Sequence, residues 1–151
     1  MKQLGNMFTT DGFSLGSGKL AEGTNANTIN VAQAFDYVIN GIIYSKAVAD
    51  NTAMTACAQQ ADNTTCLYLI TINASGTVKI TKGTEVLSAT VLNGVTPLEL
   101  PECPANEAPI GIMKIVLSGG TFTSGTTDLS GTGVTDTFYN IGWLPDRKWI
   151  A

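Results

Sequence analysis

Apolar and polar residues alternate most clearly over residues 67–82. Successive side chains of a β-strand point to opposite faces, so this alternation predicts two strands that each bury one face. The tripeptide Ala74-Ser75-Gly76 between them favours a tight turn, and Lys79 is expected to point to water. The predicted apolar face consists of Tyr68, Ile70, Ile72, Val78 and Ile80.

A second hairpin is predicted over residues 35–48, where two apolar runs flank the dipeptide Asn40-Gly41. A type I′ turn needs positive φ at both central positions, and asparagine followed by glycine meets this requirement well. The flanking runs are rich in β-branched and aromatic residues, which favour strands. The pattern therefore predicts a two-residue hairpin.

Turn signals recur about every 8–12 residues along the rest of the chain, as in antiparallel sandwiches and barrels. Strands are predicted over residues 85–92, 110–118 and 134–143, with a turn at Asn93-Gly94. Three of the five prolines lie in residues 100–111, which predicts an extended connection because proline is excluded from central strands. The pattern of residues 50–66 is compatible with either a short helix or irregular structure. The predicted fold is an all-β antiparallel sandwich or barrel, with a jelly-roll-like arrangement as one form.

The first 30 residues follow neither a strand period nor a helix period. Single apolar residues are scattered there among Gly, Ser, Thr and Asn, and they include Leu4, Phe8, Phe13 and Leu15. We predict an extended N-terminal arm over residues 1–30, followed by a single β domain over residues 31–151. The arm is expected to lie on its own subunit, on a neighbouring copy or on another protein, and the alternative is a terminus without fixed contacts.

Only 13% of the residues are charged, about half the usual share, and uncharged polar residues take their place. Such a surface can be buried against a neighbour without desolvating ions, which favours assembly. The net charge is −4 and the eight Lys and Arg are scattered, so we expect no binding to nucleic acid. We also expect no membrane span and no secretion signal, because no apolar run is long enough.

The sequence offers little catalytic chemistry, since it contains no histidine, the commonest general base and metal ligand. We therefore expect no enzyme activity and no cofactor. Cys57, Cys66 and Cys103 match no zinc spacing and are predicted to be reduced thiols, with a disulfide between Cys57 and Cys66 as the second choice.

Two groups of carboxylates are the remaining candidates for holding a cation, although ordinary solvated loop charges are the simpler interpretation. They are Glu99, Glu102 and Glu107 in the proline-rich connection, and Asp128 with Asp136 further on. The glycines of residues 131–136 are interpreted as turn residues rather than a phosphate loop, since no following helix is predicted. Near the C-terminus, one interpretation makes an interface anchor of Trp143, Trp149, Arg147 and Lys148, and the other places Trp143 in the core with a frayed tail after it.

The order and texture of these segments resemble the small decoration or cement proteins of tailed double-stranded DNA bacteriophages. The resemblance covers residues 37–140: an apolar hairpin, an Ala/Gln stretch flanked by cysteines, a glycine-turn hairpin, a Leu-Pro connection and Thr/Gly strands. No catalytic motif contributes to it. A tail-fibre or receptor-binding module of a phage virion is the alternative.

The resemblance implies a structural protein that is made in the host bacterial cytoplasm and lies on the capsid surface of the virion. Its implied partners are the major capsid protein and other copies of itself, as a homotrimer. In this interpretation the N-terminal arm contacts the capsid through Leu4, Phe8, Phe13 and Leu15.

Overall fold

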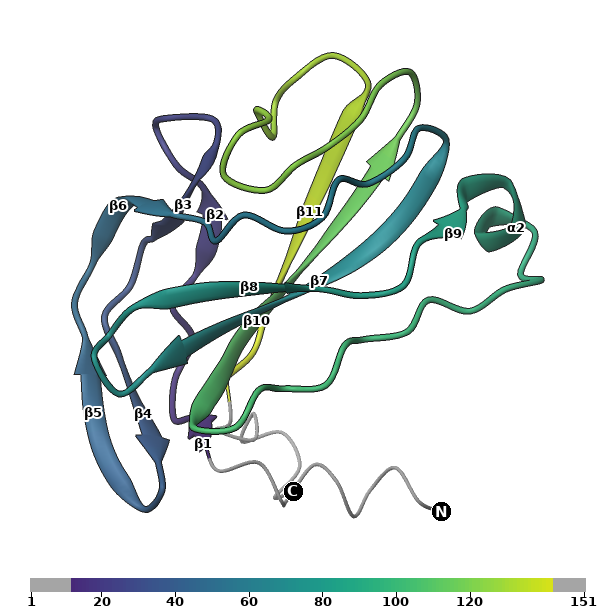
Figure 1. The fold of residues 1–151 in the computed structure, drawn as a ribbon. Coiled ribbons are helices and arrows are strands. Elements are labelled where there is room, and N and C mark those ends of the chain that lie inside the picture. The colour runs from purple at the N-terminus through teal and green to yellow at the C-terminus, as the bar shows by residue number, and fades with distance from the viewer. Residues whose placement is uncertain (1–11, 143–151) are drawn as a thin grey trace, which may run out of the picture.

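The computed structural model describes residues 12–142 of the chain, and Figure 1 shows its fold. Within this range almost all regular structure is β-strand, arranged as three antiparallel sheets that pack together. The all-β prediction is therefore confirmed. The sheets of these residues form an open sandwich and do not close into a barrel.

The largest sheet has the strand order β11-β10-β7-β8, and the short β9 pairs with the first residues of β7. Its two long central strands, β7 and β10, are antiparallel and place buried apolar residues along most of their length. The strands are β7 (Thr64–Asn73), β8 (Val78–Lys82), β9 (Val86–Leu87), β10 (Glu107–Leu117) and β11 (Val134–Asn140).

Two three-stranded sheets complete the sandwich. One has the order β1-β4-β5, and β1 also lies against β10 of the large sheet. The other has the order β2-β3-β6. Their strands are β1 (Gly12–Ser14), β2 (Leu20–Glu22), β3 (Thr28–Val31), β4 (Phe35–Ile39), β5 (Ile42–Lys46) and β6 (Ala49–Ala53).

Both predicted hairpins are present. Strands β4 and β5 pair across Asn40 and Gly41, whose φ angles of 50° and 78° are those of a type I′ turn. Strands β7 and β8 pair across the turn at residues 74–76, in which Gly76 has positive φ. The late strand predicted from residue 134 is β11.

One cluster of buried side chains connects the three sheets. Tyr68, on β7, is fully buried and meets Phe122 edge to face, with ring centroids 5.7 Å apart. Tyr37, on β4, is almost fully buried and stacks on Tyr44 of β5. The apolar face predicted for the central hairpin is confirmed, since all of its members are buried: Tyr68, Ile70, Ile72, Val78 and Ile80.

Two element predictions in the second half of the chain need correction. Residues 85–92 do not form one strand: β9 holds only two residues, and the chain then enters the short helix α2 (Ser88–Leu92). Strand β10 begins at Glu107, earlier than predicted, and accommodates Pro109 at an irregularity in its pairing with β7. A bulge is one of the places where a sheet tolerates proline.

The predicted arm also needs correction where the structure describes it. Residues 12–30 form β1, β2 and most of β3, and they pair with the body instead of leaving it. Leu20 and Ile29 from this segment are buried in the core. The predicted domain boundary at residue 30 thus falls inside β3, and residues 1–11 lie outside the described part of the chain.

Candidate functional site

Glu107, one of the candidate cation ligands, is instead the centre of a buried polar cluster. It begins β10, and its side chain is only 6% exposed. Thr71 Oγ1 of β7 donates a hydrogen bond to Glu107 Oε2 at 2.5 Å, and Lys79 Nζ of β8 donates to Oε1 at 2.7 Å. Two neighbouring strands, β7 and β8, therefore satisfy this carboxylate, which gives it a structural role in the sheet.

The other candidate carboxylates are not brought together. Glu99 and Glu102 are exposed in the connection before β10, and Asp128 is exposed in a loop. Asp136 lies on β11, where burial, and secondarily the nearby Glu22 carboxylate, raises the pKa of its carboxyl. Within residues 12–142, no three His, Cys, Asp or Glu side chains are grouped so that they could hold a metal ion.

The three cysteines are free thiols in the structure, as the first interpretation predicted, and the alternative Cys57–Cys66 disulfide is not formed. Cys66 lies in β7, and burial raises the pKa of its thiol to about 11. Because the thiolate is the reactive form, a thiol with this pKa is a poor nucleophile at neutral pH. The glycines of residues 131–136 form turns, with Gly133 at a φ of 79°.

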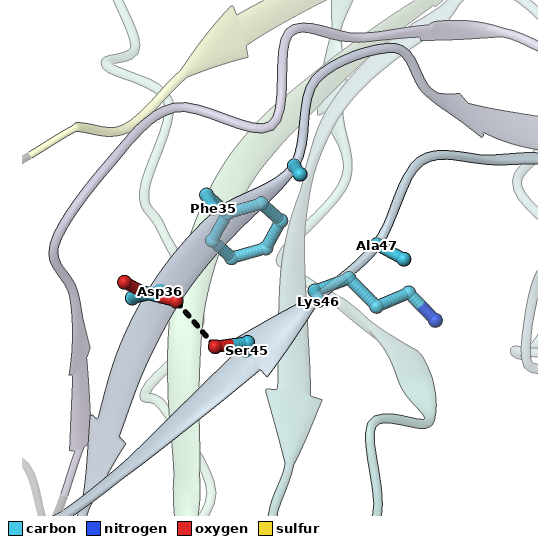
Figure 2. A pocket seen from close by; sticks show the side chains of 6 residues that line it. Phe35, Asp36, Ser45, Lys46 and Ala47 are labelled. Carbon is cyan, nitrogen blue, oxygen red and sulfur yellow. Dashed lines mark hydrogen bonds between the residues drawn. The ribbon is translucent and has the colours of Figure 1, made fainter.

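An open hollow of about 520 Å³ lies where the β4–β5 hairpin joins the body, as Figure 2 shows. Its polar groups come from adjacent strands: Ser45 Oγ donates to Asp36 Oδ1 at 2.5 Å. Lys46 Nζ points away from this pair and donates to the Gly76 carbonyl oxygen at 2.9 Å. The lysine therefore does not contact the serine hydroxyl, as it would in a Ser-Lys nucleophile pair.

The outer strand of this hairpin exposes an apolar surface. Ile42 and Ile43 of β5 are 57% and 66% exposed, and Val48 just beyond the strand is 60% exposed. We call these three residues the hairpin surface. Ile42 and Ile43 are consecutive strand residues and so lie on opposite faces of β5, which leaves apolar side chains exposed on both sides of this outer strand.

The segment around α2 lies on the other side of the molecule from β5 (Figure 1), and it exposes a second set of apolar side chains. Leu92 and Val95 are 86% and 72% exposed, and Leu87 and Leu100 are at least half exposed. We call these four residues the helix surface. No residue of α2 is buried, and none is buried from there to Asn106, so this whole excursion of the chain adds no side chain to the core.

The residues predicted to contact a capsid are only partly described. Phe13, on β1, is 38% exposed, and Leu15 follows that strand and is half-buried. Both are held by the sheet, since β1 pairs with β4 and Leu15 N donates to the Asp36 carbonyl oxygen. Leu4 and Phe8 lie outside the described residues, as do Trp143, Arg147, Lys148 and Trp149.

Sequence reasoning missed both apolar surfaces. The sequence pattern places Ile42 and Ile43 in an apolar run of a hairpin but does not indicate which face is covered, and it places Leu92 in a strand. The composition of the following segment indicates the helix surface, because its prolines disfavour a central strand there.

Comparisons with known protein families, with curated proteins and with solved structures found no match to this chain. In the described range, no helix has the length and apolar character needed to cross a membrane. The site that the geometry offers is thus a pair of apolar surfaces, the hairpin surface and the helix surface, on a body with few charges.

Proposed function

We propose that this chain is a structural protein of a tailed-phage virion that binds the outer capsid surface and stabilises the shell by bridging major capsid proteins. The observation that carries the proposal is the helix surface. A segment of about twenty residues leaves the core and places Leu87, Leu92, Val95 and Leu100 in water. Since exposure of these side chains does not help the isolated subunit to fold, their use lies in contact with another molecule.

The composition of the surface supports a permanent contact of this kind. Few charges need to be desolvated when the chain docks, and the Thr, Ser and Asn side chains can hydrogen-bond across an interface. Glu99 and Glu102, which flank Leu100 closely in the sequence, are exposed. We therefore place the capsid contact at the helix surface, and Leu4 and Phe8, which lie outside the described residues, remain further contacts proposed from the sequence.

Stabilisation of the shell follows from mass action. A protein that binds assembled capsid subunits and not dissociated ones lowers the free energy of the assembled state. In the proposal the chain acts as a homotrimer, and a trimer engages several capsid subunits at once, so weak single contacts add up through effective concentration.

Co-sedimentation with emptied heads of the phage that encodes the chain tests this proposal. The wild-type protein is expected to bind heads in a fixed stoichiometry. Leu92→Asp/Val95→Asp is expected to lower the affinity at least tenfold, because charges would be buried at the contact. The matched control is Thr84→Asp, an exposed substitution next to Glu85 in the turn before β9.

A second variant tests the N-terminal extension. Deletion of residues 2–11 stops before β1 and spares Leu20, so the described body is kept intact. We expect weaker binding to heads with an unchanged far-UV circular dichroism spectrum. If the wild-type protein does not bind heads but adsorbs to host cells or their glycans, the result would instead favour the tail-fibre or receptor-binding alternative.

A further inference from the structure

Strand β5 is an outer strand with no neighbour on one side among the described residues. It is the last strand of the β1-β4-β5 sheet and pairs only with β4 (Figure 1). Its sequence, Ile42-Ile43-Tyr44-Ser45-Lys46, has no proline, glycine, acidic residue or bulge. Such an edge presents unpaired backbone N–H and C=O groups and is a template for another strand.

The other outer strands of the described sheets are each protected. β8 carries Lys79 and Lys82, β11 carries Asp136, and β6 carries Asp50 and has an irregular register with β3. The remaining three are short or covered: β9 holds only two residues, β1 lies against β10, and the Asn140 side chain hydrogen-bonds both the N–H and the C=O of Leu20 in β2. Charges, irregularities and coverage are the usual means of preventing strand pairing.

The one charge on β5 does not protect its edge. Lys46 is the last residue of the strand, so residues 42–45 carry no charge. Ile42 and Ile43 sit at the other end and are mostly exposed. The edge thus combines open backbone groups with apolar side chains on both faces of the strand.

The turn fixes which backbone groups of β5 are open. The two residues that flank a two-residue hairpin loop form a hydrogen-bonded pair, in which each backbone bonds to the other. In this hairpin they are Ile39 and Ile42. Bonded pairs alternate along an antiparallel ladder, so Tyr44 and Lys46 also bond to β4. The N–H and C=O groups of Ile43 and Ser45 therefore face outward.

We propose that β5 pairs antiparallel with β5 of a second copy of this chain, on a two-fold axis through Ile43. In this register Ile43 is opposite its own copy, and Ile42 is opposite Tyr44 of the second copy. Every apolar side chain of the strand then meets an apolar one, and such cross-strand pairs stabilise sheets. Ser45 is opposite Gly41 and Lys46 is opposite Asn40, so no like charges face each other.

Other two-fold registers fit less well. A shift that centres the axis on Tyr44 keeps the outward groups of Ile43 and Ser45 paired but places Ile42 opposite Lys46 and Ile43 opposite Ser45. A shift that centres it on Ile42 leaves Ser45 without a partner in the second strand. The pattern of apolar residues therefore selects the register centred on Ile43, as it does within a single sheet.

The pairing produces a continuous six-stranded sheet, β1-β4-β5 followed by the same strands of the second copy in reverse. A contact of one hairpin edge is small, so the association is expected to depend on protein concentration. The inference stands apart from capsid binding, since it concerns the isolated chain. A two-fold contact gives dimers, or joins two trimers where a different surface builds the trimer.

Disulfide trapping tests the register. In a bonded antiparallel pair the Cα atoms are about 5.5 Å apart, within the roughly 4.4–6.8 Å that a disulfide spans. Ile43→Cys should therefore form a covalent dimer under mild oxidation. Val95→Cys, with similar exposure on the helix surface, is the matched control, and wild-type protein shows the background from its own cysteines.

Sedimentation equilibrium tests the contact without a covalent bond. Ile43→Lys places two cations at the axis and should weaken the association at least tenfold, halving the mass of the assembly, whereas Ile43→Val should keep it. The proposal is overturned if Ile43→Cys cross-links no faster than Val95→Cys. It is equally overturned if Ile43→Lys leaves the assembly mass unchanged, or if the wild-type chain stays monomeric at its solubility limit.

Discussion

At the scale of single residues, the cluster of Glu107, Thr71 and Lys79 shows how the largest sheet accommodates a buried carboxylate. The two hydrogen bonds to Glu107 come from strands on one side of β10, at 2.5 and 2.7 Å. We predict that Glu107→Ala lowers the free energy of unfolding by about 2 kcal/mol, because the Thr71 hydroxyl would remain buried without a partner.

Urea denaturation measures this change, with Glu99→Ala as the control. Glu99 is exposed, so its removal should change stability by less than about 0.5 kcal/mol. Equal stabilities of the two variants would contradict the structural role assigned to Glu107.

The thiol of Cys66 provides a second test at this scale. Burial raises its pKa from the ordinary 9.0 to about 11, so only about one thiol in a thousand is ionised at pH 8. Iodoacetamide should therefore alkylate Cys66 much more slowly than the half-buried Cys57, as measured by peptide mass spectrometry. In urea the two rates should become similar, and rapid labelling of Cys66 in the folded protein would disprove the assignment.

The same shift predicts a dependence of stability on pH. The pKa of the thiol is raised in the folded state. Its contribution to the free energy of unfolding is therefore fully present below pH 9, where the thiol is protonated in both states. It is lost as the pH rises towards 11, because the unfolded thiol ionises first. Cys66→Ala should reduce this alkaline loss relative to wild type.

At the scale of elements, the Asn40-Gly41 turn positions β5 and thereby the hairpin surface. Gly41 has a φ of 78° and no atom near the place of a Cβ, so a side chain there is strained by backbone conformation alone. Gly41→Val should destabilise the protein by about 1–2 kcal/mol, and Gly41→Asn should cost less because asparagine tolerates positive φ. Equal losses in thermal or urea unfolding would show that the φ angle is not the cause.

The helix surface should be dispensable for folding. Leu92 and Val95 are among the most exposed apolar residues, so Leu92→Asp/Val95→Asp should keep the unfolding free energy within about 0.5 kcal/mol per substitution. A clear loss of stability, measured by urea denaturation, would mean that these side chains support the fold and are not reserved for a partner.

The sequence predicted elements where local chemistry decides the structure. The Asn40-Gly41 turn and the alternation from Tyr68 to Ile72 are local signals, and both hairpins are present. Residues 85–92 contain β-branched residues but have no partner strand beyond β9, so the chain forms α2 instead. Propensity for strands is expressed only where a neighbouring strand is available.

Contacts between distant residues explain the other differences. The segment over residues 12–30 has no regular period, yet it forms strands because β4, β6 and the Asn140 side chain pair with it. The hydrogen bonds of Glu107 could not be predicted from the sequence, because its partners, Thr71 and Lys79, lie about thirty residues earlier. Exposure of Ile42 and Ile43 likewise depends on which strand ends the sheet.

At the scale of the whole molecule, the protein combines a well-packed core with apolar surfaces on two sides. Few charged groups lie between them, since only 13% of residues are charged. Such a body can be enclosed by neighbours at little cost in ion desolvation. This is the property that a shell-stabilising protein requires, and it agrees with the proposed role in a virion.

Cryo-electron microscopy of phage particles that carry the chain tests the proposed role most directly. We predict density for the β-sandwich on the outer capsid surface, with the helix surface facing the major capsid protein. Absence of the chain from the shell, or its presence there with Leu92 and Val95 turned towards solvent, would contradict the account.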